Sequence, residues 1–133
     1  MRRTQQRRAA IWALYQSDLL NRPLAETFPR DTHPFTRALG ELVVARRPEL
    51  DELIREYASG WSLERIAPLE RSILRVGLVE MLHGEELPGE ASIPAEGAID
   101  EAVETAKRFC GSEAPAFVNG ILGAVLRARP AAR

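Results

Sequence analysis

The chain has 133 residues, of which 45% are hydrophobic and 28% are charged, and its formal net charge is −1. These values are typical of one globular domain over residues 1–133, and they exclude a strongly polybasic protein, so any affinity for a polyanion must come from a local patch. The single cysteine, Cys110, excludes an internal disulfide and a cysteine-rich zinc site, which fits a cytoplasmic protein. No apolar run approaches the roughly 18 residues of a membrane-spanning helix.

The spacing of apolar residues is helical along nearly the whole chain. No alternating run of β-branched residues is long enough to predict a strand. We therefore expect an all-α protein in which a short turn follows Ser62. The predicted helices span residues 3–20, 35–46, 48–60, 68–83, 94–110 and 115–127.

The predicted helix over residues 68–83 is the most apolar of these. Its apolar residues occupy two stripes and cover most of its circumference, which predicts a position in the middle of a bundle. Pro68 suits the first turn of this helix, and Gly84 suits its end.

Asn119 and Gly120 lie within the first turns of the last predicted helix. Asn-Gly more often marks a tight turn, and glycine inside a helix costs about 1 kcal/mol relative to alanine. Either a close contact with another helix or a closely bound ligand would account for this glycine. The sequence alone does not choose between the two.

Motifs of enzymes and metal sites are lacking in the sequence. His33 and His83 are fifty residues apart without a nearby second ligand, and Cys110 falls on an apolar stripe that suits the core. There is no phosphate-binding glycine loop, no HExxH and no GxSxG. We therefore expect neither catalysis nor a cofactor.

Four arginines, Arg2, Arg3, Arg7 and Arg8, lie within the first eight residues. A solvated helix start would explain them, but positive charge at a helix N-terminus is unfavourable by about 0.3–1 kcal/mol per well-placed group. Arginine binds phosphate well through its bidentate fork. The cluster therefore favours binding of a polyanion.

Residues 76–106 carry eight acidic side chains and neither lysine nor arginine. A solvated acidic face and a docking surface for a basic partner both account for such a run. Glu80 stands out because its position on the helix lies within an apolar stripe. A carboxylate there needs a partner, from this chain or from another.

Three stretches of the sequence resemble the NusB family of bacterial transcription antitermination factors. The family's patterns are an AKx[FY]G helix end followed by FVNG[VI]L, a central ILRx[AG]xxE[ML], and an arginine-containing first helix. The matching stretches here are PAEGAIDEAVETAKRFCGSEAPAFVNGILGAVLR, ERSILRVGLVEML and RRAAIWALYQ.

The resemblance implies a bundle of about seven helices in two packed subdomains, with a basic helix at 3–20 and a C-terminal helical half at about 61–128. It also implies a non-enzymatic protein that binds boxA-type single-stranded RNA together with the small-subunit ribosomal protein NusE. With other Nus factors and RNA polymerase, the pair would suppress termination, notably on ribosomal RNA operons. Some members of the family self-associate, so a homodimer is left open.

Site residues follow from the matched positions. The basic start (Arg2, Arg3, Arg7 and Arg8) matches the family's RNA-binding helix, and Arg7 is the best-matched position. Glu113 and Phe117 fall at the loop and the helix mouth near the RNA, where a base stacked on Phe117 would contribute about 1–3 kcal/mol. Tyr15 and Glu80 match positions at the ribosomal-protein interface. Asn119 and Gly120 would let the last helix pack closely while it holds Phe117 at the edge.

This chain departs from the family pattern at several positions that bear on RNA affinity. Thr4 and Gln5 stand where arginine is common, Cys110 stands where glycine is common, and the loop before FVNG has no lysine or histidine.

Two alternatives to the antitermination role are a helical protein–protein adaptor without RNA binding and an isolated RNA-binding domain related to ribosomal-RNA cytosine methyltransferases.

Overall fold

The computed structural model describes residues 2–89 and 92–129, and this part of the chain is all-α, as predicted. Its regular structure consists of five α-helices and three short 3-10 turns. The α-helices are α1 (Arg3–Leu20), α2 (Pro34–Tyr57), α3 (Pro68–His83), α4 (Ala95–Phe109) and α5 (Ala114–Ala128), and the 3-10 turns are η1 (Leu24–Glu26), η2 (Leu63–Arg65) and η3 (Gly84–Glu86).

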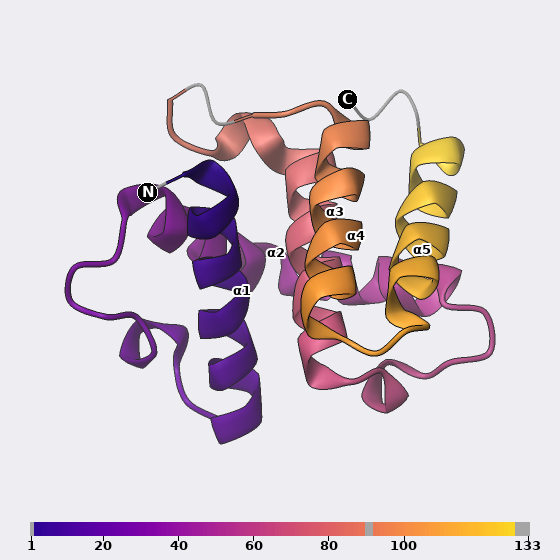
Figure 1. Ribbon diagram of the computed structural model, residues 1–133, viewed down its shortest axis with the longest axis horizontal. Helices are drawn as coiled ribbons and strands as arrows, with labels where there is room; N and C mark the ends of the chain where they lie inside the picture. Colours follow the sequence, from indigo (N-terminus) through magenta and orange to yellow (C-terminus); the bar gives the residue numbers. More distant parts are fainter. Residues whose placement is uncertain (1, 90–91, 130–133) are drawn as a thin grey trace.

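Helix α3 is the centre of the bundle, as its apolar circumference predicted. Every residue from 72 to 81 is buried, and α3 packs against each of the other four α-helices. Helix α1 lies on one side of α3 and α5 on the other, while α2 crosses behind (Figure 1). One cluster of buried apolar side chains runs through all five helices.

Helix α2 corrects the sequence prediction of two separate helices at 35–46 and 48–60. Pro48 lies inside one continuous helix and is exposed to solvent. A proline in a helix interior costs about 3 kcal/mol. Burial of Leu50, Leu53 and Ile54 beyond it contributes roughly 1.5–3 kcal/mol for each side chain, which outweighs that cost.

Gly77 is a point of close contact between α3 and its neighbours α4 and α5. A Cβ atom at this position would lie 2.9 Å from Cδ1 of Leu122 and 3.4 Å from Cβ of Ala102. Because Leu122 is fully buried, it has little room to move away. The absence of a side chain at Gly77 therefore allows α4 and α5 to pack directly on the central helix.

A buried ion pair between Arg7 and Glu80 joins α1 to α3. Nε of Arg7 donates to Oε1 of Glu80 at 2.6 Å, and its Nη2 donates to Oε2 at 2.9 Å. Only 3% of Arg7 and 2% of Glu80 are exposed. Nη1 of Arg7 also lies 3.2 Å from Glu101 on α4, so a single guanidinium links three helices. The partner that Glu80 needed therefore comes from this chain.

A second ion-pair network, centred on Arg75, joins α3 to α1 and α2. Its Nη1 donates to Asp18 at 3.0 Å, and its Nε donates to Asp51 at 2.8 Å. Burial alone would raise the pKa of Asp18, but Arg47 and Arg75 hold it below its ordinary value. Asp18 therefore stays ionised between these cations.

Among the described residues, no helix combines the length and the apolar character that crossing a bilayer requires.

We predict strong non-additivity when Arg7 and Glu80 are substituted. Arg7→Met or Glu80→Leu alone should lower the free energy of unfolding by about 3–5 kcal/mol, because each leaves one buried charge unpaired. The double substitution should cost less than either single one. Urea unfolding of the four proteins measures the coupling. Arg46→Met is the control, because the pair of Arg46 and Glu86 is exposed and should contribute under about 1 kcal/mol. Additive losses at Arg7 and Glu80 would contradict this account.

Candidate nucleic-acid and partner-binding surfaces

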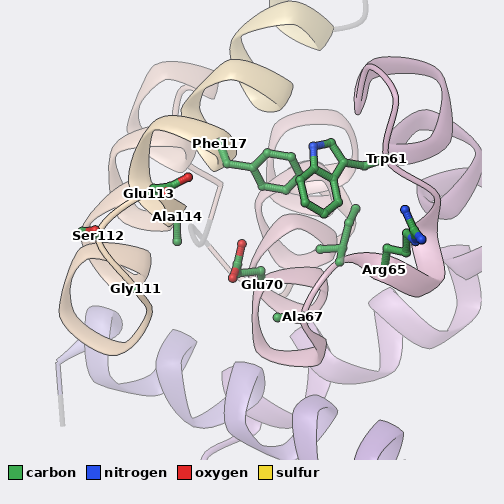
Figure 2. Close-up of a pocket in the computed structure, with 10 residues that line it drawn as sticks. Trp61, Arg65, Ala67, Glu70, Gly111, Ser112, Glu113, Ala114 and Phe117 are labelled. Atoms are coloured by element: carbon green, nitrogen blue, oxygen red, sulfur yellow. The ribbon is translucent and has the colours of Figure 1, made fainter.

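An open groove with a volume of about 550 Å³ lies between the start of α3, the α4–α5 loop and the start of α5. We call it the aromatic groove. Trp61 and Phe117 lie face to edge on one wall, Glu113 lies toward one end, Arg65 lies toward the other, and Glu70 lies between the ends (Figure 2). Gly111, Ser112 and Ala114 complete the end that carries Glu113.

Trp61 and Phe117 form the apolar wall of this groove. Their ring centroids are 6.1 Å apart and their planes meet at 69°, an edge-to-face arrangement that aromatic pairs prefer. Trp61 precedes η2 and is 53% exposed, while Phe117 lies in the first turn of α5 and packs partly against the core. Phe117 therefore keeps the exposed Trp61 ring in place, and the two rings form a solvent-accessible aromatic surface.

The charged side chains of the aromatic groove are one cation and two carboxylates. Arg65 and Glu113 are exposed, and Glu70 is partly buried. Burial raises the pKa of the Glu70 carboxyl above its ordinary value. Burial, and then the charge of Glu70, also raises the pKa of the neighbouring Cys110 thiol, so this cysteine is not an activated nucleophile.

Gly120 lies on the open surface of α5, contrary to the expectation that it lets the helix pack closely. Apart from the adjacent residues and backbone of α5 itself, no described atom lies within 4 Å of a Cβ built there, and Asn119 is exposed as well. Gly120 instead lines a smaller hollow that shares Trp61 and Phe117 with the aromatic groove. The close contact of α5 with another helix is made at Gly77 of α3 instead. Of the two explanations that the sequence offered for Gly120, only a closely bound ligand is therefore left.

The four arginines of the basic start do not share one face. Arg7 points into the core toward Glu80, whereas Arg2 and Arg3 are exposed. The Arg3 guanidinium lies 4.0 Å above the Phe35 ring of α2. Arg8 points toward α4, where its Nε donates to Oγ1 of Thr105 at 3.4 Å. This geometry removes Arg7 from the surface and leaves Arg2, Arg3 and Arg8 as the accessible cations.

A second aromatic surface lies between α1 and the end of α4. Trp12 makes edge-to-face contacts with Tyr15, at a centroid distance of 5.6 Å, and with Phe109, at 5.4 Å. Phe109 is 39% exposed, and the guanidinium groups of Arg8 and Arg108 lie 5.7 and 5.6 Å from its ring centroid. We call this the α1–α4 face.

Sequence reasoning did not single out Trp12, Trp61 or Phe109. Trp61 follows Gly60 in the turn after α2, outside any helix, so the helical spacing of apolar residues says nothing about it. Trp12 and Phe109 each lie within a helix, where an aromatic residue is easily taken for part of the buried apolar stripe. An aromatic residue next to a helix end or next to arginines was the available signal.

The acidic stretch is partly engaged with the rest of the chain. Glu80 and Glu101 contact Arg7, and Glu86 pairs with Arg46 at 2.6 Å. Glu85, Asp100 and Glu104 are exposed, and Glu90 lies outside the described residues.

His83 belongs to the same region. Its Nε2 lies 2.9 Å from Glu49, and its Nδ1 lies 3.1 Å from Glu86. Together with Glu85, His83 and Glu86 bring potential ligand atoms within 4.8 Å of one another. Both ring nitrogens of His83 already have carboxylate partners in this chain. The cluster is explained by these contacts and does not in itself indicate a metal site.

Comparison with known sequences places residues 4–127 within the model of the NusB family. A curated relative from Symbiobacterium thermophilum, the transcription antitermination protein NusB, is 36% identical, and the match covers 96% of this chain and 90% of the relative.

Solved structures agree with this match. NusB of T. maritima superposes with a TM-score of 0.81 at 29% identity, covering 96% of this chain and 92% of the other. A chain from a crystal structure of NusB and NusE with double-stranded RNA has a TM-score of 0.76 over 96% of this chain and 99% of that chain. At 24% identity, this second likeness shows the fold alone.

We predict that Gly120→Ala stabilises the protein by about 1 kcal/mol, because it improves helix propensity without meeting other atoms. Gly77→Ala is the matched control, since its new methyl group would press on Leu122. That variant should gain nothing or lose stability. Thermal unfolding of both variants measures the difference. A loss of stability in Gly120→Ala would mean that Gly120 has a structural role after all.

Proposed function

The chain belongs to the NusB family of transcription antitermination proteins, which are not enzymes, and we propose that it binds boxA-type single-stranded RNA together with the ribosomal protein NusE. The solved complex of NusB and NusE with double-stranded RNA, whose fold this chain shares, supports NusE and RNA as the first ligands to consider. The choice of single-stranded boxA RNA follows from the family resemblance. In this proposal the chain is one RNA-binding domain that acts in the cytoplasm. With RNA polymerase and other Nus factors, it would suppress termination, notably on ribosomal RNA operons.

The exposed pair of Trp61 and Phe117 is the observation that carries the RNA proposal. Unpaired bases stack on aromatic side chains, and each stacked base contributes about 1–3 kcal/mol. Trp61 is more than half exposed and held in place by Phe117, so little ordering is needed before a base can stack. Gly120, beside the same pair, leaves room for the strand to approach α5 closely.

The carboxylates of the aromatic groove suit the edges of bases. Glu70 and Glu113 can accept hydrogen bonds from the exocyclic amino groups of cytosine, adenine or guanine. Phosphates would be repelled by the same carboxylates. We therefore infer that bases enter this groove and that the backbone passes outside it.

The role of Arg7 changes in this proposal. Arg7 is committed to Glu80, so it would support RNA binding by fixing α1 rather than by touching phosphate. Arg2, Arg3 and Arg8 remain the candidates for phosphate contacts on α1.

The NusE part of the proposal rests on Tyr15 and on the acidic surface. Tyr15 is partly exposed on α1, beside Trp12. Exposed carboxylates at Glu85, Asp100 and Glu104 complement a basic protein. Glu80 is 2% exposed, so its contribution to partner binding would also be indirect, through the position of α1.

The two alternatives differ in their support. The isolated methyltransferase-type domain gains none from the relatives, because the antitermination protein of S. thermophilum matches over 90% of its own length. The second alternative, a protein–protein adaptor that does not bind RNA, is distinguished from the main proposal by measuring RNA binding.

We expect Phe117→Ala and Trp61→Ala each to weaken binding of a labelled boxA RNA by at least about fivefold, the loss of one stacked base. Fluorescence anisotropy with and without NusE measures this, and NusE should tighten binding. Val44→Ala is the control, because Val44 is an exposed apolar residue on α2 that lines neither hollow. Binding should also fall as salt rises. No binding at low salt, with or without NusE, would reject the RNA proposal and leave the adaptor.

A further inference from the structure

We propose that the α1–α4 face, formed by Trp12, Phe109, Arg8 and Arg108, is a second contact for the same single-stranded RNA. This inference rests on the proposed function and extends it. The strand would run from the aromatic groove past residues 110–113 to the end of α4. The protein would then hold a longer segment of RNA than the groove alone can cover.

The geometry of Phe109 is the first observation behind this inference. The ring is 39% exposed at the last residue of α4, and Trp12 holds it edge to face at 5.4 Å. The guanidinium groups of Arg8 and Arg108 lie over the same ring, 5.7 and 5.6 Å from its centroid. A base that stacks on Phe109 would take the place of one guanidinium, which could then pair with a phosphate. An exposed aromatic ring flanked by arginines combines a stacking surface with phosphate-binding groups, which is how proteins bind single strands.

The charge distribution is the second observation. The aromatic groove contains Arg65 against Glu70 and Glu113, so its charged side chains cannot neutralise the phosphates of a bound strand. The end of α4 supplies Lys107 and Arg108, both exposed, and Arg8 lies beside them. Glu104, one turn earlier on α4, is an exposed acid close in sequence to this basic group.

The two surfaces are joined by a short connection. Phe109 ends α4, residues 110–113 follow, and Phe117 lies in the first turn of α5. Gly111, Ser112 and Glu113 of this connection already line the aromatic groove. A strand could therefore pass from Phe117 to Phe109 along this connection, where Glu113 is the exposed acid that its phosphates would have to avoid. Glu85 and Asp100 lie earlier in the chain, in η3 and α4.

The same charges argue against the basic partner protein as the occupant of this face around Phe109, so the contact proposed for that partner at Tyr15, beside Trp12, would not extend to the end of α4. A basic protein would be repelled by Arg8, Lys107 and Arg108. It would instead be drawn toward exposed carboxylates such as Glu85. RNA has the charge that the α1–α4 face complements.

The chain offers a direct test, because its two tryptophans lie on different surfaces. Trp61→Phe leaves Trp12 as the only tryptophan and reports on the α1–α4 face, while Trp12→Phe leaves Trp61 and reports on the groove. Each variant, with NusE present, is titrated with boxA RNAs of about 4 and about 12 nucleotides, within the range of single-strand site sizes. The short RNA should change only Trp61 emission, and the long RNA should change the emission of both.

A second set of variants measures affinity. Lys107→Gln combined with Arg108→Gln should weaken binding of the long RNA by about fivefold or more and leave the short RNA unaffected. Arg30→Gln is the charge-matched control, because Arg30 is exposed in the α1–α2 loop. Circular dichroism checks that each variant is folded.

The outcomes separate this inference from the function on which it rests. If neither tryptophan responds to either RNA, the proposed function fails. If Trp61 responds while Trp12 does not respond to the long RNA, only the second contact is overturned. If Trp12 responds to NusE but not to RNA, the α1–α4 face is a protein-binding surface and the inference is wrong.

Discussion

The buried ion pair of Arg7 and Glu80 joins the first helix to the central helix, and the placement of the α1–α4 face depends on it. Two charges in the interior are tolerated only because each satisfies the other with two hydrogen bonds. Glu101 extends the pair to α4. The orientation of α1 against α3 and α4 therefore follows from one guanidinium, and with it the positions of Trp12, Tyr15 and Arg8.

This constraint divides the basic start into arginines with different roles. Arg7 holds the fold, Arg3 packs on Phe35, and Arg8 reaches the end of α4. In the proposed function, RNA contacts would consequently not be confined to one basic helix. Stacking at Trp61 and Phe117 and base-edge contacts at Glu70 and Glu113 would take place in the aromatic groove, and phosphate contacts near Phe109 would take place on the α1–α4 face.

The sequence predicted the helical class, the central position of α3 and the need of Glu80 for a partner, because all three follow from the spacing of apolar residues. It missed the continuity of α2, since a proline looks like a break unless the burial on both sides of it is known. It assigned Arg7 to RNA, because residue type and position in the chain do not reveal which way a side chain points. The exposure of Gly120 and the contact of Trp61 with Phe117 depend on how distant segments meet, and no local pattern encodes that.

The most direct test of this account follows the arginine Nε–H groups by NMR while boxA RNA and NusE are added. The account predicts that the Arg7 signal is protected from solvent exchange and does not shift, because its Nε–H stays bound to Glu80. The signals of Arg8 and Arg108 should shift. Release of Arg7 from Glu80 on RNA binding, with a shift and faster exchange of its signal, would contradict the claim that this arginine belongs to the fold.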